Sequence, residues 1–389
     1  MKENKEAVIR APKNALKVKG ANEKPYYAGV DIIKILAVFL VVCIHFFLYS
    51  GFYSTHIASD KWIVPIATRW LAYICVPLFM ISTGYLMKNK KISAGYYKGL
   101  IKIIVIYIVV SLICMKFNHD TYQREFTAWT ALKGFLEYSN ANYGWYVNYY
   151  ICIFALVPFL NLAFNGLETK GQRLTLVVTV TLITVFARSL FLGFEANEQI
   201  RLFPNYLDGM WPLAYYFTGA FIREYPIKTK NKLPAKLLTG GILLGAVWFI
   251  SESTYAQTCE NSLNKFVFFS RHFNDYSTYP VFIIAVCVFI LLCDIKTTNK
   301  PVKFILRQLS GCTFATYLIS YVFDNKFYMD FNAKYSDVYD RWTHAYEIIG
   351  KVFICALVCG LAIHNIYNVC ELCIKKLTTK KEKEVSQEN

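Results

Sequence analysis

The segment DIIKILAVFLVVCIHFFLYS, residues 31–50, decides the fold class, because it combines an apolar run of transmembrane length with three ionisable side chains. A membrane-spanning helix needs about 20 mainly apolar residues, and this segment supplies them. Ionisable groups are costly in hydrocarbon, so they usually face a bundle interior or an aqueous cavity. Asp31, Lys34 and His45 therefore indicate a functional face on a membrane helix.

The spacing of these three groups places them on one side of the predicted helix. Lys34 and His45 are eleven residues apart, which corresponds to about three turns and about 16 Å along the axis. Asp31 precedes Lys34 by three residues, so the two side chains are predicted to pair. An imidazole titrates near neutral pH, which makes His45 a candidate general base or nucleophile.

The composition of the whole chain indicates a polytopic membrane protein. Of its 389 residues, 56% are hydrophobic and only 17% are charged, and the mean hydropathy is +0.34. A soluble domain would carry more charge. We predict an all-α membrane helix bundle of about ten transmembrane helices, in one domain over residues 30–370. The predicted spans are roughly 30–50, 67–87, 101–117, 144–163, 174–195, 206–223, 237–252, 279–295, 309–324 and 346–370.

The distribution of basic residues predicts that both termini are cytoplasmic. With the N-terminus inside, 28 of the 42 Lys and Arg residues fall in inner segments and 10 in outer ones, an excess typical of cytoplasmic loops. Residues 1–29 form a basic cytoplasmic tail that we expect to be disordered. Residues 371–389 form a second charged cytoplasmic tail, with disorder expected after Lys375. Because the net charge of +16 is dispersed over short loops, we do not expect nucleic-acid binding.

The 12 cysteines do not indicate a metal site. They lie mostly within predicted spans, where a free cysteine behaves as a small apolar residue. Cys370 and Cys373 form a single CxxC, and one pair without a second is a weak indication of metal binding. We therefore predict no metal.

Three long predicted outer segments are rich in Tyr, Asn, Asp, Trp and Phe. These segments are 118–143, 253–278 and 325–345. Their composition fits an interfacial aromatic belt with ordinary loops. It fits equally well a polar, aromatic surface for a hydroxyl-rich ligand such as a sugar.

A second basic cluster follows the second predicted span. Lys98 and Lys102 are four residues apart at the start of the next helix, so they present one face together. With Lys34 near the cytoplasmic boundary, they are candidates to bind a phosphate-bearing cofactor, since lysine binds phosphate as a point charge. The alternatives are snorkelling of Lys34 to the headgroups and the ordinary excess of lysine in inner loops.

Four motifs in the chain resemble, in order, those of the membrane acyltransferase 3 family. Lys34 and His45 resemble its first-helix signature of a basic residue, ten residues and a histidine. The other three resemble its V-P-L-F-F-x-x-S-G-Y-L, W-Y-L…P-F-L and F-x-x-Y-L-I elements. They are Val76-Pro-Leu-Phe-Met-Ile-Ser-Thr-Gly-Tyr-Leu86, Trp145-Tyr-Val-Asn-Tyr-Tyr150 leading to Val157-Pro-Phe-Leu-Asn161, and Phe314-Ala-Thr-Tyr-Leu-Ile319.

The resemblance implies a multi-pass acyltransferase of a bacterial cell membrane. Such proteins move an acyl group, usually acetyl from cytoplasmic acetyl-CoA, to a hydroxyl of an extracytoplasmic cell-envelope glycan or polysaccharide. By this resemblance His45 is catalytic and Lys34 is its motif partner. Asp31, Lys98 and Lys102 would help to bind acyl-CoA, Asp31 by holding Lys34 in place. The expected partners are acyl-CoA, the glycan acceptor and membrane lipids.

Two departures from the family pattern and two other functions stay open. The family often has an arginine-rich pair where this chain has Lys98 and Lys102, and often a histidine where this chain has Ser320. A transporter or flippase for a glycan or lipid intermediate also suits polar groups in spans, although no internal repeat typical of transporters is evident. A non-catalytic membrane sensor or assembly factor is the other alternative. If the protein is an enzyme, His45 could act either as a general base or as a nucleophile that carries the acyl group in an acyl-histidine relay.

Overall fold

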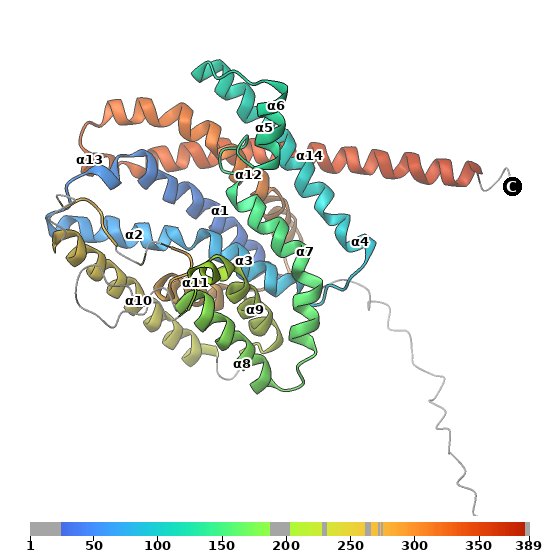
Figure 1. Ribbon diagram of the computed structural model, residues 1–389, viewed down its shortest axis with the longest axis horizontal. Helices are drawn as coiled ribbons and strands as arrows, with labels where there is room; N and C mark the ends of the chain where they lie inside the picture. The colour runs from blue at the N-terminus through green and yellow to red at the C-terminus, as the bar shows by residue number, and fades with distance from the viewer. Residues whose placement is uncertain are drawn as a thin grey trace, which may run out of the picture.

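The protein is an all-helical bundle in the part of the chain that the computed structural model describes, with no strand there (Figure 1). The all-α class predicted from composition is therefore confirmed. Residues 1–24 of the predicted tail at 1–29 lie outside the described residues. Residues 187–195 of the predicted 174–195 span lie outside them as well. The described residues are 25–186, 203–227, 232–260, 266–270, 273 and 275–385.

The helices of the described residues follow one another in this order. The first seven are α1 (Ala28–Tyr49), α2 (Ile63–Tyr73), α3 (Cys75–Met87), α4 (Ala94–Tyr97), α5 (Gly99–Tyr122), α6 (Ala128–Leu136) and α7 (Trp145–Asn165). The next seven are α8 (Lys170–Thr181), α9 (Trp211–Glu224), α10 (Lys232–Glu260), α11 (Tyr279–Leu292), α12 (Lys300–Lys334), α13 (Val338–Thr343) and α14 (Ala345–Val385).

Within the described ranges, six helical segments are long and apolar enough to cross a membrane. They are Ala28–Ser54, Asp60–Met87, Ala94–Tyr122, Trp145–Asn165, Lys232–Glu260 and Ala345–Thr378. These segments support a multi-pass membrane protein, but they do not establish the predicted count of about ten. The predicted 309–324 span is part of the 35-residue α12, which has charged ends, and the 206–223 span contains the 14-residue α9. The cytoplasmic placement of the termini stays a prediction.

Helices α1 and α12 lie side by side in the bundle. α12 packs against α1, α5 and α14, and α1 also packs against α2 and α3. Two contacts show that α1 and α12 run in the same direction: Lys34 meets Ser310, and His45 meets Asp324. Residues nearly 280 positions apart in the chain are thereby brought together along one shared face.

Helices α3 and α9 approach each other closely because each has a glycine at the crossing. A Cβ atom added at Gly84 would overlap the carbonyl oxygen of Tyr216, and one added at Gly219 would overlap the carbonyl oxygen of Ile81. Small residues at helix crossings allow this backbone approach in membrane proteins. The crossing fixes the position of α3, which contributes a wall of the cavity described below.

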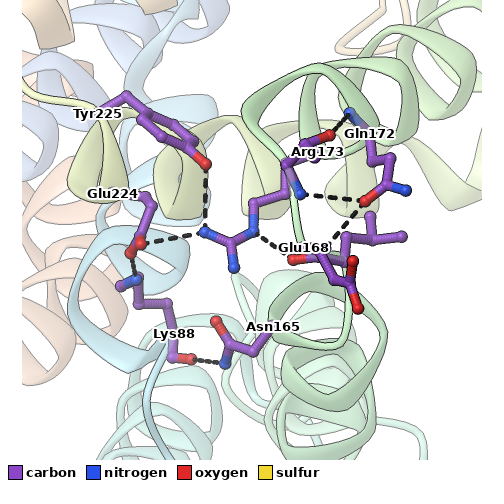
Figure 2. A network of polar contacts seen from close by, with 9 residues as sticks. Lys88, Asn165, Glu168, Gln172, Arg173, Glu224 and Tyr225 are labelled. Carbon is purple, nitrogen blue, oxygen red and sulfur yellow. Dashed lines mark hydrogen bonds and ion pairs between the residues drawn. The ribbon is translucent and has the colours of Figure 1, made fainter.

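A charged network joins the ends of α3, α8 and α9 (Figure 2). The Glu224 carboxylate accepts hydrogen bonds from Lys88 Nζ and, at 3.0 Å, from Arg173 Nη1. Arg173 Nη1 also donates to the Tyr225 hydroxyl at 3.2 Å, and Asn165 Nδ2 donates to the Lys88 carbonyl at 2.9 Å. One carboxylate thus pairs with two cations and anchors the C-terminal end of α3.

Helix α14 continues to Val385, where the sequence predicted disorder after Lys375. Its last turns extend beyond the rest of the bundle (Figure 1). The segment is rich in Lys and Glu, which are good helix formers, and Lys375 Nζ lies 2.5 Å from Glu371 Oε1 in an i,i+4 pair. The expectation of disorder is therefore wrong through Val385, and residues 386–389 lie outside the described chain.

Candidate functional site

His45 is oriented by a buried carboxylate in the interior of the bundle. Its side chain is 14% exposed, and its Nδ1 lies 2.9 Å from Oδ2 of the fully buried Asp324 on α12. A carboxylate at this distance favours a proton on Nδ1, so the lone pair is on Nε2. A histidine held in this way by a carboxylate has the geometry of a general base.

Two tyrosines complete the surroundings of this pair. The Tyr143 hydroxyl donates to Asp324 Oδ2 at 2.7 Å, and the Tyr143 ring packs on the His45 imidazole with the ring centroids 4.2 Å apart. The Tyr49 hydroxyl lies 2.9 Å from the Tyr143 hydroxyl and accepts a hydrogen bond from Asn325 Nδ2 at 3.3 Å. The imidazole and the carboxylate are therefore held by groups from α1, α12 and the segment before α7.

Lys34 and Asp31 meet on Ser310 of α12, nearer the N-terminal end of the same helix face. Lys34 Nζ donates to the carbonyl oxygen and to Oγ of Ser310, both at 2.9 Å. Ser310 Oγ in turn donates to Asp31 Oδ1 at 2.6 Å. Asp31 thus reaches Lys34 through the Ser310 hydroxyl, instead of by the direct pair that the sequence predicted.

A cavity of about 250 Å³ lies beside Lys34, lined by residues of α1, α3, α5, α7 and α12. Lys34 and Lys102 contribute positive charge to its lining. The remaining walls are mainly apolar and aromatic, and they include Phe79, Tyr146 and Tyr317. The cavity therefore combines two cations with walls that suit an uncharged chain.

The structure brings Lys102 to this cavity but does not bring Lys98 there. Lys102 Nζ also donates to Asn368 Oδ1 of α14 at 2.8 Å and lies 5.1 Å from the centre of the Tyr367 ring. Lys98 lies at the junction of α4 and α5, is exposed, and precedes Lys102 by about one turn. Its charge is available to a group outside the cavity.

His45 lies beyond the far end of the cavity. Along α12 the lining ends at Tyr317, seven residues before Asp324, which is about 10 Å of helix. The Tyr317 hydroxyl donates to the carbonyl oxygen of Tyr143, whose ring packs on His45. Tyr317 and Tyr143 thus connect the end of the cavity to the imidazole.

The residues of the site that the sequence did not predict include Asp324, Tyr143 and Ser310. Asp324 carried a detectable signal, because it is an acidic residue at the end of a predicted span, where such groups usually mark function. It lies one turn after Ser320, the position where the family often has a histidine; Ser320 Oγ donates to the Tyr317 carbonyl at 2.8 Å. Tyr143 and Ser310 carried no comparable signal, because uncharged hydroxyl residues are frequent throughout this chain.

An oriented histidine and a cationic cavity inside a bundle of apolar helices are what a membrane-embedded transferase needs. The family model of an acyltransferase domain matches residues 27–364. The chain belongs to this acyltransferase 3 family, as its motifs predicted, and it is a multi-pass membrane acyltransferase. No curated protein and no solved structure matches the chain.

Proposed function

We propose that the protein is an O-acetyltransferase that moves an acetyl group from cytoplasmic acetyl-CoA to a hydroxyl of an extracytoplasmic cell-envelope glycan. The observation that carries this proposal is the pair of His45 Nδ1 and Asp324 Oδ2, which lie 2.9 Å apart. The pair lies past the end of a cavity whose lining includes Lys34 and Lys102. Membership of the family supports acyl transfer itself. The acetyl donor and the glycan acceptor are what the family resemblance implies, and the lining of the site is consistent with them.

The cationic lining of the cavity supports an anionic donor. Lys34 and Lys102 would bind the phosphates of coenzyme A, each as a point charge. Lys98, exposed one turn before Lys102, adds charge outside the cavity. The mainly apolar walls would then take the uncharged arm of the donor, with its acyl group toward Tyr317.

In this proposal His45 is the general base. Its Nε2 takes the proton of the acceptor hydroxyl as the hydroxyl oxygen attacks the thioester carbonyl carbon. The new C–O bond forms, the C–S bond breaks, and the imidazolium returns the proton to the leaving thiolate. Asp324 stabilises the imidazolium while it exists, and general-base catalysis of this kind is worth about 10²–10⁴-fold in rate. An acyl-histidine relay would use the same nitrogen as a nucleophile.

Aromatic rings close to Tyr143 support a hydroxyl-rich acceptor. Trp145 follows Tyr143 by two residues and is 43% exposed. Its ring stacks on Tyr276 with centroids 5.9 Å apart, and Tyr276 stacks on Tyr73 at 4.6 Å. Flat aromatic rings beside a few polar groups are typical of small-molecule binding sites, and the exposed part of the Trp145 ring would pack on a sugar.

The test compares the wild-type protein with His45→Ala at matched protein levels. O-acetylation of the cell-envelope glycan is measured in cells, and transfer from labelled acetyl-CoA is measured with purified protein in lipid nanodiscs. We expect acetylation by the wild-type protein and by His119→Ala, which changes an exposed histidine, and none by His45→Ala. Unchanged acetylation by His45→Ala would overturn the catalytic assignment, and a transporter would neither bind nor consume acetyl-CoA.

A further inference from the structure

We propose that Ser82 and Tyr146 hydrogen-bond the amide groups of the pantetheine arm of the acyl donor inside the cavity. This inference rests on the proposed acyl-CoA donor and deepens it, because it names the part of the donor that the cavity recognises. The pantetheine arm is a narrow chain with two amide groups, and it ends in the sulfur that carries the acyl group.

Both hydroxyls are buried and unpaired. Ser82 is 3% exposed and Tyr146 is 5% exposed, and both residues line the cavity. Neither hydroxyl has a hydrogen-bond partner among the residues that the structure describes. Buried hydroxyls are normally hydrogen-bonded, so two unpaired hydroxyls on one cavity point to a polar ligand.

Two threonine hydroxyls on the same cavity are already satisfied. Thr83 Oγ1 donates to the carbonyl oxygen of Phe79 at 2.8 Å, and Thr313 Oγ1 donates to the carbonyl oxygen of Ser310 at 3.0 Å. A hydroxyl in a helix commonly bonds to the preceding turn in this way. Ser82 makes no such bond within the described residues.

The positions of the two hydroxyls match the order of groups along the donor. Ser82 lies on α3, about 7 Å along the helix from Met87, whose carbonyl oxygen accepts a hydrogen bond from Asn161 Nδ2 at 2.8 Å. Tyr146 lies near the start of α7 and packs edge-on against Tyr317, with ring centroids 6.0 Å apart. An arm that enters beside Lys102 would meet Ser82 first and Tyr146 last, with its thioester close to Tyr317.

An alkyl chain would not satisfy this lining. The tail of a phospholipid has no acceptor to offer, so it would leave both hydroxyls buried and unpaired, which is unfavourable. Amide carbonyls accept hydrogen bonds from hydroxyl groups and leave the narrow apolar walls in contact with methylene groups. The lining therefore favours an amide-bearing thioester over a lipid as the acyl donor.

The experiment measures the KM of acetyl-CoA for Ser82→Ala and Tyr146→Phe, each of which removes one oxygen atom. We expect KM to rise about three- to tenfold in each, the loss of one hydrogen bond to the ligand. The melting temperature without donor should be unchanged or higher, because the deleted hydroxyl is unpaired there. Thr218→Val is the matched control: it deletes a buried, unpaired hydroxyl on α9 that is not part of the cavity lining within the described chain.

Competition against labelled acetyl-CoA locates the lost contact on the donor. Free pantetheine should compete less well with both variants than with wild type, while 3′-phosphoadenosine 5′-diphosphate should compete equally well with all three. Competition by this nucleotide indicates that the arm belongs to coenzyme A. Transfer from acetylated acyl carrier protein, used as a separate donor, indicates that the arm belongs to the carrier protein. Either source supports recognition of the arm.

Two results would overturn different claims. If wild-type protein consumes acetyl-CoA and both variants keep its KM and its competition by pantetheine, the assignment of Ser82 and Tyr146 fails while the proposed function stands. If wild-type protein neither binds nor consumes acetyl-CoA or the acetylated carrier protein, the proposed function itself fails.

Discussion

Nδ1 of His45 lies 2.9 Å from Oδ2 of Asp324, although 279 positions separate the two residues in the chain. The contact exists because α1 and α12 lie side by side and run in the same direction. In the proposed mechanism His45 is a general base, which requires a partner that selects its tautomer and holds its ring. Asp324 provides that partner from a helix near the other end of the chain.

Changing Asp324 to Asn should lower kcat about 10²- to 10⁴-fold, with a smaller effect on the KM of acetyl-CoA. The amide has no negative charge to stabilise the imidazolium, and it no longer selects the proton on Nδ1. Steady-state acetyl transfer by purified protein measures this. Asp330→Asn, on an exposed position of the same helix, is the control, and a wild-type kcat for Asp324→Asn would contradict the role.

Changing Tyr143 to Phe should lower kcat about three- to tenfold, the effect of one lost hydrogen bond. The variant keeps the ring that packs on His45 and loses only the hydroxyl that donates to Asp324. Tyr143→Leu removes both contacts and should be slower still. Equal rates for wild type and Tyr143→Phe would show that the hydroxyl does not support the pair.

Changing Lys102 to Ala should raise the KM of acetyl-CoA more than changing Lys98 to Ala, because only Lys102 lines the cavity. Both variants should weaken the dependence of KM on salt, since each removes one positive charge near the proposed phosphate site. Titration of KM against ionic strength measures both effects. Lys116→Ala, on an exposed position further along α5, controls for net charge. A larger effect at Lys98 would place the phosphates outside the cavity.

Changing Gly84 to Ala should destabilise the bundle by about 1–3 kcal/mol, as overpacking of a close contact does. The added Cβ would overlap the backbone carbonyl of Tyr216, which moves only if α3 and α9 separate. Thermal unfolding in nanodiscs is the measurement. Gly245→Ala on α10 is the matched control, because nothing lies within 4 Å of its added Cβ. Equal melting temperatures for both variants would refute the tight crossing.

Asp294 should make unfolding sensitive to acid. Burial alone would raise its pKa, but Lys236 Nζ at 2.7 Å and Lys232 Nζ at 3.0 Å outweigh burial and lower the pKa below its usual value of 3.8. Its contribution to stability is therefore present above about pH 4 and lost as the pH falls through the lower folded-state pKa. Melting temperatures from pH 6 to 3 should fall less for Asp294→Asn than for wild type. Parallel curves would contradict this pairing.

The sequence by itself determined the features that depend on neighbours in the chain. Apolar length and helical periodicity indicate membrane helices without knowledge of their partners. The eleven-residue spacing of Lys34 and His45 is a property of one helix, so their shared face and separation followed directly. Motifs in order identified the acyltransferase 3 family, which the match over residues 27–364 confirms.

Only the tertiary structure decided which groups meet those residues. Asp324 and Ser310 reach His45 and Lys34 because α12 packs along α1, and a row of apolar spans does not specify which helices become neighbours. Lys98 and Lys102 share a helix face, yet about 6 Å of axial offset leaves only Lys102 at the cavity. The site is assembled from five helices, and its contacts depend on helix crossings such as that of α3 and α9, where close backbone packing fixes the distances.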